Sequence, residues 1–186
     1  MRIVAGRHRG RVLAAPKGRD TRPTAARARE ALFNILAHGD FGDRAPLDEA
    51  IVLDAFAGTG AFAFEALSRG AAFATLLDTD RAALAAAKSN AIALKETANV
   101  AIEPRDAIRP GRATRAHTLV FLDPPYGKDL AAPTLGALAN NGWIAGGALV
   151  IAEIGAKEDL APPDGFTALD ERIYGAAKFV LMRYRG

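Results

Sequence analysis

The sequence predicts an α/β fold with a mostly parallel β-sheet, and three observations lead to this prediction. Short runs rich in Val, Leu and Ile alternate with helical stretches along most of the 186 residues, a pattern typical of right-handed βαβ units. Glycines mark several of the turns between these runs. Residues 166–185 contain two further strand-like runs joined at Gly175, which predicts a closing hairpin with one antiparallel strand.

The individual elements follow from periodicity and from turn residues. A first amphipathic helix is expected over residues 24–39, with Thr24 as its N-cap and Gly39 at its end. Five strands are expected at 51–56, 73–78, 99–103, 117–123 and 147–153, and further helices at 60–70, 81–96 and 130–142. Ligands bind beyond the carboxyl ends of such strands, so functional residues are expected where the strands end.

Composition bounds the class of protein. No cysteine is present, which excludes disulfides, thiolate metal sites and a cysteine nucleophile, and no metal ion is expected. The sequence has no run of about 18 apolar residues, so it predicts no membrane span. The first residues lack the apolar core of a secretory signal, which predicts a cytoplasmic protein. The length favours a single domain, and nothing in the sequence demands more than a monomer.

Positive charge is concentrated at the start of the chain. Residues 1–29 carry nine Arg or Lys against one acid, whereas the whole chain has a net charge of +3. We expect residues 1–22 to form a basic extension, a small hairpin, on a catalytic core of residues 23–186. Such an extension favours a polyanionic partner such as nucleic acid, although a solvated tail would have the same composition. The candidate contacts to RNA are Arg7, Arg9, Arg11, Arg19 and Arg27.

A glycine loop follows the first expected strand. In "LDAFAGTGAF" the residues Gly58 and Gly60 lie in the turn before a helix, where glycine permits a tight turn and close approach of a ligand to the backbone. With Ala63 the pattern also matches the dinucleotide fingerprint. Asp54, just before the turn, disfavours a pyrophosphate and favours a ligand that carries an ammonium and a sulfonium.

Acidic residues follow the next two expected strands. Asp78 and Asp80 follow the second, and an acid there accepts the hydroxyls of an adenosine ribose. Asp78 is the first choice, because Asp80 directly precedes a helix and suits its N-cap. Asp106 follows the third strand and could accept a hydrogen bond from an adenine amine, but an ordinary loop aspartate fits that spacing equally well.

The fourth expected strand ends in "DPPY", which is Asp123, Pro124, Pro125 and Tyr126. Neither proline has an amide hydrogen, and Pro124 favours an extended Asp123. The carboxylate and a backbone carbonyl could therefore accept the two N–H groups of an exocyclic amine, while Tyr126 stacks on the heterocycle. The sequence predicts these four residues as the catalytic motif.

Together these motifs resemble the class I S-adenosylmethionine-dependent amino-methyltransferases. The strings "RIVAGRHRGRVL", "RPTAARAREALFNIL", "FAGTGAFAFEALSRGA" and "NGWIAGGALVIAE" resemble, over nearly the whole chain, the RsmD family of 16S ribosomal RNA guanine-N2 methyltransferases. The resemblance implies a Rossmann-like sheet of seven strands, one of them antiparallel. It also implies methylation of guanine 966 in 16S rRNA, within an assembling small ribosomal subunit.

The resemblance assigns roles to individual positions. In the family the methionine portion of the cofactor is held by residues that match Asp54, Phe56, Gly58, Thr59 and Gly60. The ribose falls to Asp78, with Asp80 kept as a candidate, and the adenine to Asp106 and Ala107. Arg22, Thr24 and Glu30 match an upstream motif near the cofactor. Many members carry a further acid after the fifth strand, but the nearby Glu153 is given no role.

Alternative functions remain at this point. An adenine-N6 or cytosine-N4 methyltransferase would use the same "DPPY", although one that acts on DNA normally needs a larger target-recognition segment. A nicotinamide oxidoreductase would explain the glycines but not "DPPY", and a non-catalytic RNA-binding assembly factor would explain the basic extension alone. Since methylation of carbon five of a pyrimidine usually needs a cysteine, the absence of cysteine favours transfer to an amine.

Overall fold

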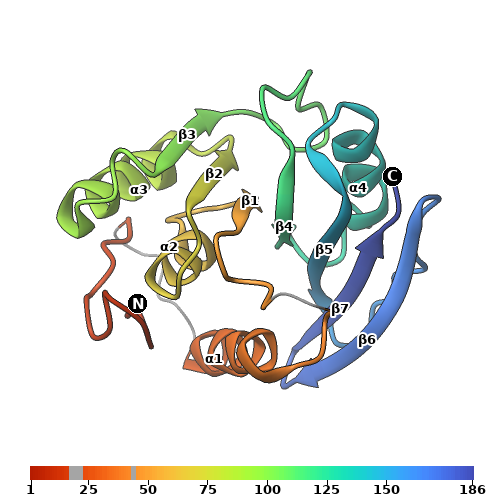
Figure 1. Cartoon of the computed structure of the whole chain (residues 1–186), viewed down its shortest axis with the longest axis horizontal. Helices are drawn as coiled ribbons and strands as arrows, with labels where there is room; N and C mark the ends of the chain where they lie inside the picture. Colours follow the sequence, from red (N-terminus) through yellow and green to blue (C-terminus); the bar gives the residue numbers. More distant parts are fainter. Residues whose placement is uncertain (17–22, 43–44) are drawn as a thin grey trace.

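Seven strands form one sheet in the part of the chain that the computed structural model describes, residues 1–16, 23–42 and 45–186. The strands are β1 (Ile51–Ala55), β2 (Phe73–Asp78), β3 (Val100–Pro104), β4 (His117–Leu122), β5 (Ile144–Gly155), β6 (Phe166–Tyr174) and β7 (Ala177–Tyr184). They lie side by side in the order β3-β2-β1-β4-β5-β7-β6 (Figure 1). The first five strands in this order run parallel to one another, and β7 alone runs antiparallel to both of its neighbours. The predicted fold class and the closing hairpin at Gly175 are therefore confirmed.

The described helices agree closely with the sequence prediction. They are α1 (Pro23–His38), α2 (Ala61–Ser68), α3 (Arg81–Leu94) and α4 (Ala131–Asn140). Asp80 caps α3, as predicted, because its side chain accepts hydrogen bonds from the backbone of Ala82 and Ala83. Helix α1 begins at Pro23, a residue suited to the first helical position. Thr24 therefore lies in the first turn, and its prediction as the N-cap is wrong.

Two apolar clusters cover the two faces of the sheet. Side chains alternate between the faces along each strand, and α1, α2 and α3 pack on one face while α4 packs on the other. In β1, for example, Val52 belongs to the cluster beneath α1 and α2, whereas Leu53 belongs to the cluster beneath α4. This alternation decides which polar side chains share a face. Within the described ranges, no helix is both long and apolar enough to span a membrane.

Strand β5 is longer than predicted, because it begins at Ile144 and ends at Gly155. Ile144 already pairs with His117 of β4, but the register then shifts before Leu149 pairs with Leu119. Gly147, with φ of 79°, lies in the irregular stretch. A glycine pair normally signals a turn, so the sequence alone placed the start of the strand at Gly147, within this irregular stretch.

Residues 1–13 fold back on themselves and dock against α2 and α3. Ile3 donates to the carbonyl of Arg11 at 3.0 Å, and Leu13 donates to that of Met1 at 2.9 Å. Both apolar side chains are buried in the core. The first chain segment is therefore packed on the body of the protein (Figure 1).

Buried polar side chains of the body hold this segment in place. Glu65 of α2 accepts the backbone N–H groups of Val4 and Ala5 at 2.8 and 3.1 Å. Asn90 of α3 bonds both the N–H and the carbonyl of Ala14. Because these side chains are nearly fully buried, their hydrogen bonds would be costly to leave unmade.

Candidate active site

Three carboxylates reach the same face of the sheet at its carboxyl end. In β1, Asp54 alternates with Leu53 and so faces the cluster of α1 and α2. Phe121 of β4 faces the same cluster, and Asp123 lies two residues further on. In β5, Ala152 pairs with Leu122, so Glu153 lies level with Asp123 and on the same face. Strand register thus brings together acids from three neighbouring strands.

A cavity of about 250 Å³ opens beside these acids. The glycine loop forms one wall, and Asp123 and Glu153 contribute to another. Its full lining is Met1, Ala15, Arg29, Phe56, Ala57, Gly58, Thr59, Ala61, Phe62, Asp123 and Glu153. The cavity therefore joins the loop predicted to hold a cofactor to the loop predicted to hold a target amine. Four predicted site residues line it, namely Phe56, Gly58, Thr59 and Asp123.

The glycine loop forms the tight turn that its sequence predicts. Gly58 and Gly60 have φ of 56° and 82°, in the left-handed region that favours glycine. A Cβ at Gly60 would lie 2.6 Å from Leu76 and Phe64, so packing requires that glycine, whereas a Cβ at Gly58 would meet nothing within 4 Å. Phe56 also has φ of 62°, a conformation that costs free energy and is often found at functional sites.

Asp54 lies beneath the loop. Its side chain is 1% exposed and accepts the backbone N–H of Ala63 at 3.0 Å, in the first turn of α2. The pKa of Asp54 is raised to about 8, chiefly by burial; the bond from Ala63 opposes the shift, and the charge of Asp78 adds to it. The carboxyl group is placed to support the loop from below, and it does not line the cavity.

Asp78 and Asp80 have different surroundings. Asp78 accepts the N–H of Gly58 at 2.7 Å and that of Asp80 at 2.8 Å, so it bonds directly to the glycine loop. The carboxylate of Asp80 caps α3. Asp106 is exposed and accepts the N–H of Ile108 at 3.0 Å within its own turn, while Ala107 is buried. None of these four side chains lines the cavity.

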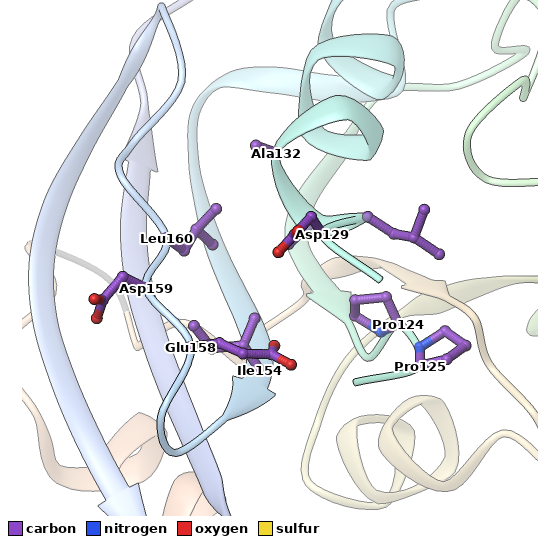
Figure 2. Close-up of a pocket in the computed structure, with 10 residues that line it drawn as sticks. Pro124, Pro125, Asp129, Ala132, Ile154, Glu158, Asp159 and Leu160 are labelled. Atoms are coloured by element: carbon purple, nitrogen blue, oxygen red, sulfur yellow. The ribbon is translucent and has the colours of Figure 1, made fainter. Parts of the chain in front are cut away.

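The loop after β4 is connected to the end of β5. The hydroxyl of Tyr126 donates to Oε1 of Glu153 at 2.5 Å, and the N–H of Gly127 donates to Oε1 of Glu158. Pro124 is buried, whereas Pro125 is exposed. Figure 2 shows both prolines facing a second, smaller cavity of about 70 Å³, with Ile154 and Glu158 opposite them. Tyr126 is 43% exposed.

The carboxyl groups of Asp123 and Glu153 influence each other. Burial raises the pKa of Asp123 well above its ordinary value, and the charges of Glu153 and Asp54 raise it further. Burial also raises the pKa of Glu153, although the Tyr126 hydroxyl and the charge of Arg29 favour its ionised form. The pair therefore holds a proton more readily than two separate carboxylates in water would.

Arg29 of α1 is a buried cation in this cavity. Its residue is 5% exposed, its Nη2 donates to the carbonyl of Arg2 at 3.2 Å, and its Nε has no hydrogen-bond partner among the described residues. Burial lowers its pKa, but the charges of Glu65, Glu153 and Asp54 oppose this shift. An unpaired buried N–H is costly, and it suits a ligand with an anionic group.

Sequence reasoning missed Arg29 and Glu153 as site residues. Arg29 was counted with the basic extension, and nothing in its local pattern distinguishes it from its neighbour Arg27, which is exposed. Glu153 did offer a signal, since it is the one charged residue in the apolar run of β5. It lies two residues after Ile151 of the core and so on the same face of the strand. Of the predicted upstream motif, Glu30 is exposed on α1, and Arg22 lies outside the described residues.

The predicted RNA-binding arginines differ in their contacts. Arg7 forms an ion pair with the buried Glu96 at 2.7 Å, and Arg11 donates to the carbonyl of Ala93 at 2.7 Å. Both therefore help to dock the first segment, a role that the sequence did not predict. Arg9 is exposed on the same segment, as is Arg27 on α1. Arg19 lies outside the described residues.

Comparison with known proteins places this fold and site in a class. A solved structure described as a putative methyltransferase from Escherichia coli matches all of this chain and 98% of its own, with a TM-score of 0.83 and 36% identity. A magnesium protoporphyrin IX methyltransferase from Synechocystis, described with bound SAM, shares the fold, with a TM-score of 0.63 at 14% identity. The sheet order and the strand-end cavity are those of a class I methyltransferase fold.

Sequence relatives narrow the class to a family. The Ribosomal RNA small subunit methyltransferase D of E. coli strain K12 is 36% identical over 97% of this chain and 88% of its own length. The protein of the same name from Haemophilus influenzae is 34% identical over 97% and 92%. The chain belongs to the RsmD family, whose model, described as Conserved hypothetical protein 95, matches residues 1–183.

Proposed function

We propose that this protein transfers a methyl group from S-adenosylmethionine to the exocyclic N2 amine of a guanine in 16S ribosomal RNA. One observation carries the proposal: a single cavity joins the glycine loop to Asp123, the acid of the Asp-Pro-Pro-Tyr motif. The relatives named above as small subunit rRNA methyltransferases support the rRNA substrate. The choice of N2 of guanine, and of position 966, rests on the family resemblance.

The residues around the cavity fit the cofactor. The open space beside Gly58 lets a ligand approach the backbone. Arg29 lines the cavity, and its buried Nε has no hydrogen-bond partner among the described residues, so its guanidinium suits the carboxylate of the methionine portion. Asp78, which already orients Gly58, is the proposed ribose acceptor, and Asp106 and Ala107 are proposed beside the adenine. S-adenosylmethionine supplies an electrophilic methyl group on a sulfonium.

Asp54 has a modified role in this proposal. Its carboxyl group supports the first turn of α2 and the loop above it, and it acts on a bound sulfonium or ammonium through its charge. The ionised form of a buried carboxyl is favoured when a cation comes near. We therefore propose that Asp54, like Asp123, shifts toward its ionised form as the cavity fills.

Asp123 and its neighbours would bind the target amine. The carboxylate accepts one N–H of the amine, which favours attack by the nitrogen lone pair in line with the methyl group. As the new N–C bond formed and the C–S bond of the sulfonium broke to release a neutral thioether, positive charge would develop on the nitrogen, and Asp123 would stabilise it. The amine then loses one proton, which the carboxylate of Asp123 would be placed to accept. Tyr126, which is 43% exposed, is available for stacking on the base.

The first segment supports an RNA partner. Met1 of this docked segment lines the cavity, and so does Ala15, which follows the segment in the chain. The exposed Arg9 therefore belongs to a segment that borders the site. Arginines beside a base-binding cavity neutralise the phosphates that flank an extruded nucleotide. We propose residues 1–22 as an RNA-binding extension of a catalytic core formed by residues 23–186. We also propose a monomer, acting in the cytoplasm on an assembling small subunit.

A transfer assay tests this function. The protein is incubated with tritiated S-adenosylmethionine and, in parallel, with small-subunit particles, naked 16S RNA and duplex DNA, and the products are digested to nucleosides. We expect label in N2-methylguanosine from an RNA substrate. Label in an N6-methyladenine or an N4-methylcytosine would replace the proposed target, and no transfer to any substrate, despite cofactor binding, would favour an RNA-binding assembly factor.

A further inference from the structure

Two acids of β5 and the turn after it hold consecutive residues of the loop after β4. Glu153 accepts the hydroxyl of Tyr126 at 2.5 Å. Glu158 accepts the N–H of Gly127 through Oε1, and its Oε2 accepts the N–H of Gly155 at 3.1 Å. Figure 2 shows Glu158 beside Ile154, across the small cavity from Pro124 and Pro125. The loop after β4 is therefore attached to β5 through the side chain of Tyr126, and to the turn after β5 through the backbone of Gly127.

The contact between Glu153 and Tyr126 has a geometry suited to orienting a ring. Glu153 projects from a parallel strand at the level of Asp123, a rigid position in the middle of the sheet. Tyr126 remains 43% exposed as a residue while its hydroxyl is bonded to this strand. A hydrogen bond from a hydroxyl to a carboxylate is short and strong. It thus restricts the ring while leaving much of its surface accessible.

We propose that Glu153 is a positioning residue that fixes the ring of Tyr126 in the orientation in which it stacks on the target base beside Asp123. This inference rests on the proposed function, because it assigns the orienting group for the base within the same site. Glu153 also lines the cavity with Asp123. Its carboxylate therefore bonds to Tyr126 and borders the cavity beside Asp123.

The charges around Glu153 agree with this role. Arg29 faces it from α1, Asp54 lies on β1, Asp123 follows β4, and Glu158 lies in the turn after β5. Burial and the bond to Glu153 raise the pKa of Tyr126, so its hydroxyl stays protonated as a donor. The charge of Glu153 also raises the pKa of Asp123, and its removal should shift the acid limb of the activity profile to lower pH.

Four variants test the proposal: Glu153→Ala, Glu153→Gln, Tyr126→Phe and the double variant E153A/Y126F. The matched control is Glu171→Ala, on the exposed surface of β6. We expect Glu153→Ala and Tyr126→Phe each to raise KM for RNA by roughly 10-fold, as the loss of one charged hydrogen bond would do. Glu153→Gln should recover most of this loss, because its amide oxygen still accepts the hydroxyl. The double variant should be no worse than about twofold beyond Tyr126→Phe alone.

A second measurement does not depend on activity. The chain has three tyrosines, so fluorine NMR of 3-fluorotyrosine-labelled protein gives three resonances, and Tyr126→Phe assigns one of them. We expect that resonance to shift and sharpen in Glu153→Ala and to stay unchanged in Glu171→Ala.

The outcomes separate the two hypotheses. An unchanged Tyr126 resonance in Glu153→Ala, or fully multiplicative effects in the double variant, would overturn the positioning role. If wild-type protein methylates no RNA while the resonance shifts as expected, the proposed function fails and the contact between Glu153 and Tyr126 stands.

Discussion

The glycine loop after β1 and the Asp-Pro-Pro-Tyr loop after β4 border the same cavity, but they are held in different ways. The glycine loop is supported from inside the β1-α2-β2 unit, by Asp54 through Ala63 and by Asp78 through Gly58. The loop after β4 is held from outside its own unit, by Glu153 and Glu158. One contact of the second set ends on an exposed aromatic ring.

This difference suggests a division of work between the two loops. Carboxylates bonded to backbone N–H groups fix the course of a loop, as a site for an invariant cofactor requires. A bond to a side-chain hydroxyl fixes the orientation of a ring at a surface where a large substrate must enter and leave. We therefore expect changes in the two supports to separate cofactor binding from methyl transfer.

The largest effects are expected when the acid that serves each of the two loops is removed in turn. Asp123→Ala should lower the rate of methyl transfer on the order of 10²-fold or more, because it removes an acceptor for developing charge, and leave cofactor affinity within a few-fold. Asp78→Ala should instead weaken cofactor binding by roughly 10- to 100-fold, since it removes a charged acceptor that also orients Gly58. Calorimetry with S-adenosylhomocysteine and single-turnover transfer measure the two quantities.

Asp170→Ala, on β6 away from the cavity, is the matched control for this pair. Equal loss of cofactor affinity in Asp123→Ala and Asp78→Ala would show that the two loops form one binding unit and would break the comparison.

An effect on the pH dependence of stability is expected at Asp54. Its pKa is about 8 in the folded protein against an ordinary value of 3.8. The unfolded chain therefore releases this proton at lower pH than the folded protein does, and stability falls as pH rises between these two values. Asp54→Asn keeps an acceptor for Ala63 and does not titrate. Its stability relative to wild type should rise with pH in this window, by up to about 1.4 kcal/mol per pH unit.

Urea unfolding at a series of pH values measures this difference. The exposed Asp164→Asn is the control and should follow the wild-type curve. A constant difference between Asp54→Asn and wild type across the window would mean that Asp54 is ionised in the free protein.

The smallest effect is expected from the first segment, which should act on the target side alone. Arg9→Gln should weaken RNA binding a few-fold and reduce the slope of log K against log salt by about 0.7 to 0.9, the loss of one phosphate contact. Cofactor affinity should not change. Filter binding over a range of salt concentrations measures the slope, with Arg172→Gln on β6 as the control.

Arg7→Gln offers a contrast within the same segment. Because Arg7 pairs with the buried Glu96, its loss should also lower the free energy of unfolding. If Arg9→Gln leaves the salt slope unchanged, the exposed charge of the segment does not contact RNA.

The sequence by itself determined what depends on near neighbours in the chain. The Gly58 and Gly60 loop, the cap at Asp80 and the polar ending of β4 each depend on residues a few positions apart, and local sterics and hydrogen bonding decide them. The alternation of strands and helices likewise predicted the sheet, and with it the edge where ligands bind.

Tertiary structure alone decided which distant side chains meet. Glu153 lies beside Asp123 because β5 is in register with β4 across an irregularity, and a shift of one residue would send it to the opposite face. Helix packing buries Arg29 in the cavity while Arg27 stays exposed, and docking of the first segment commits Arg7 to Glu96. Register and packing are settled by the free energy of the whole core, which no short stretch of sequence contains.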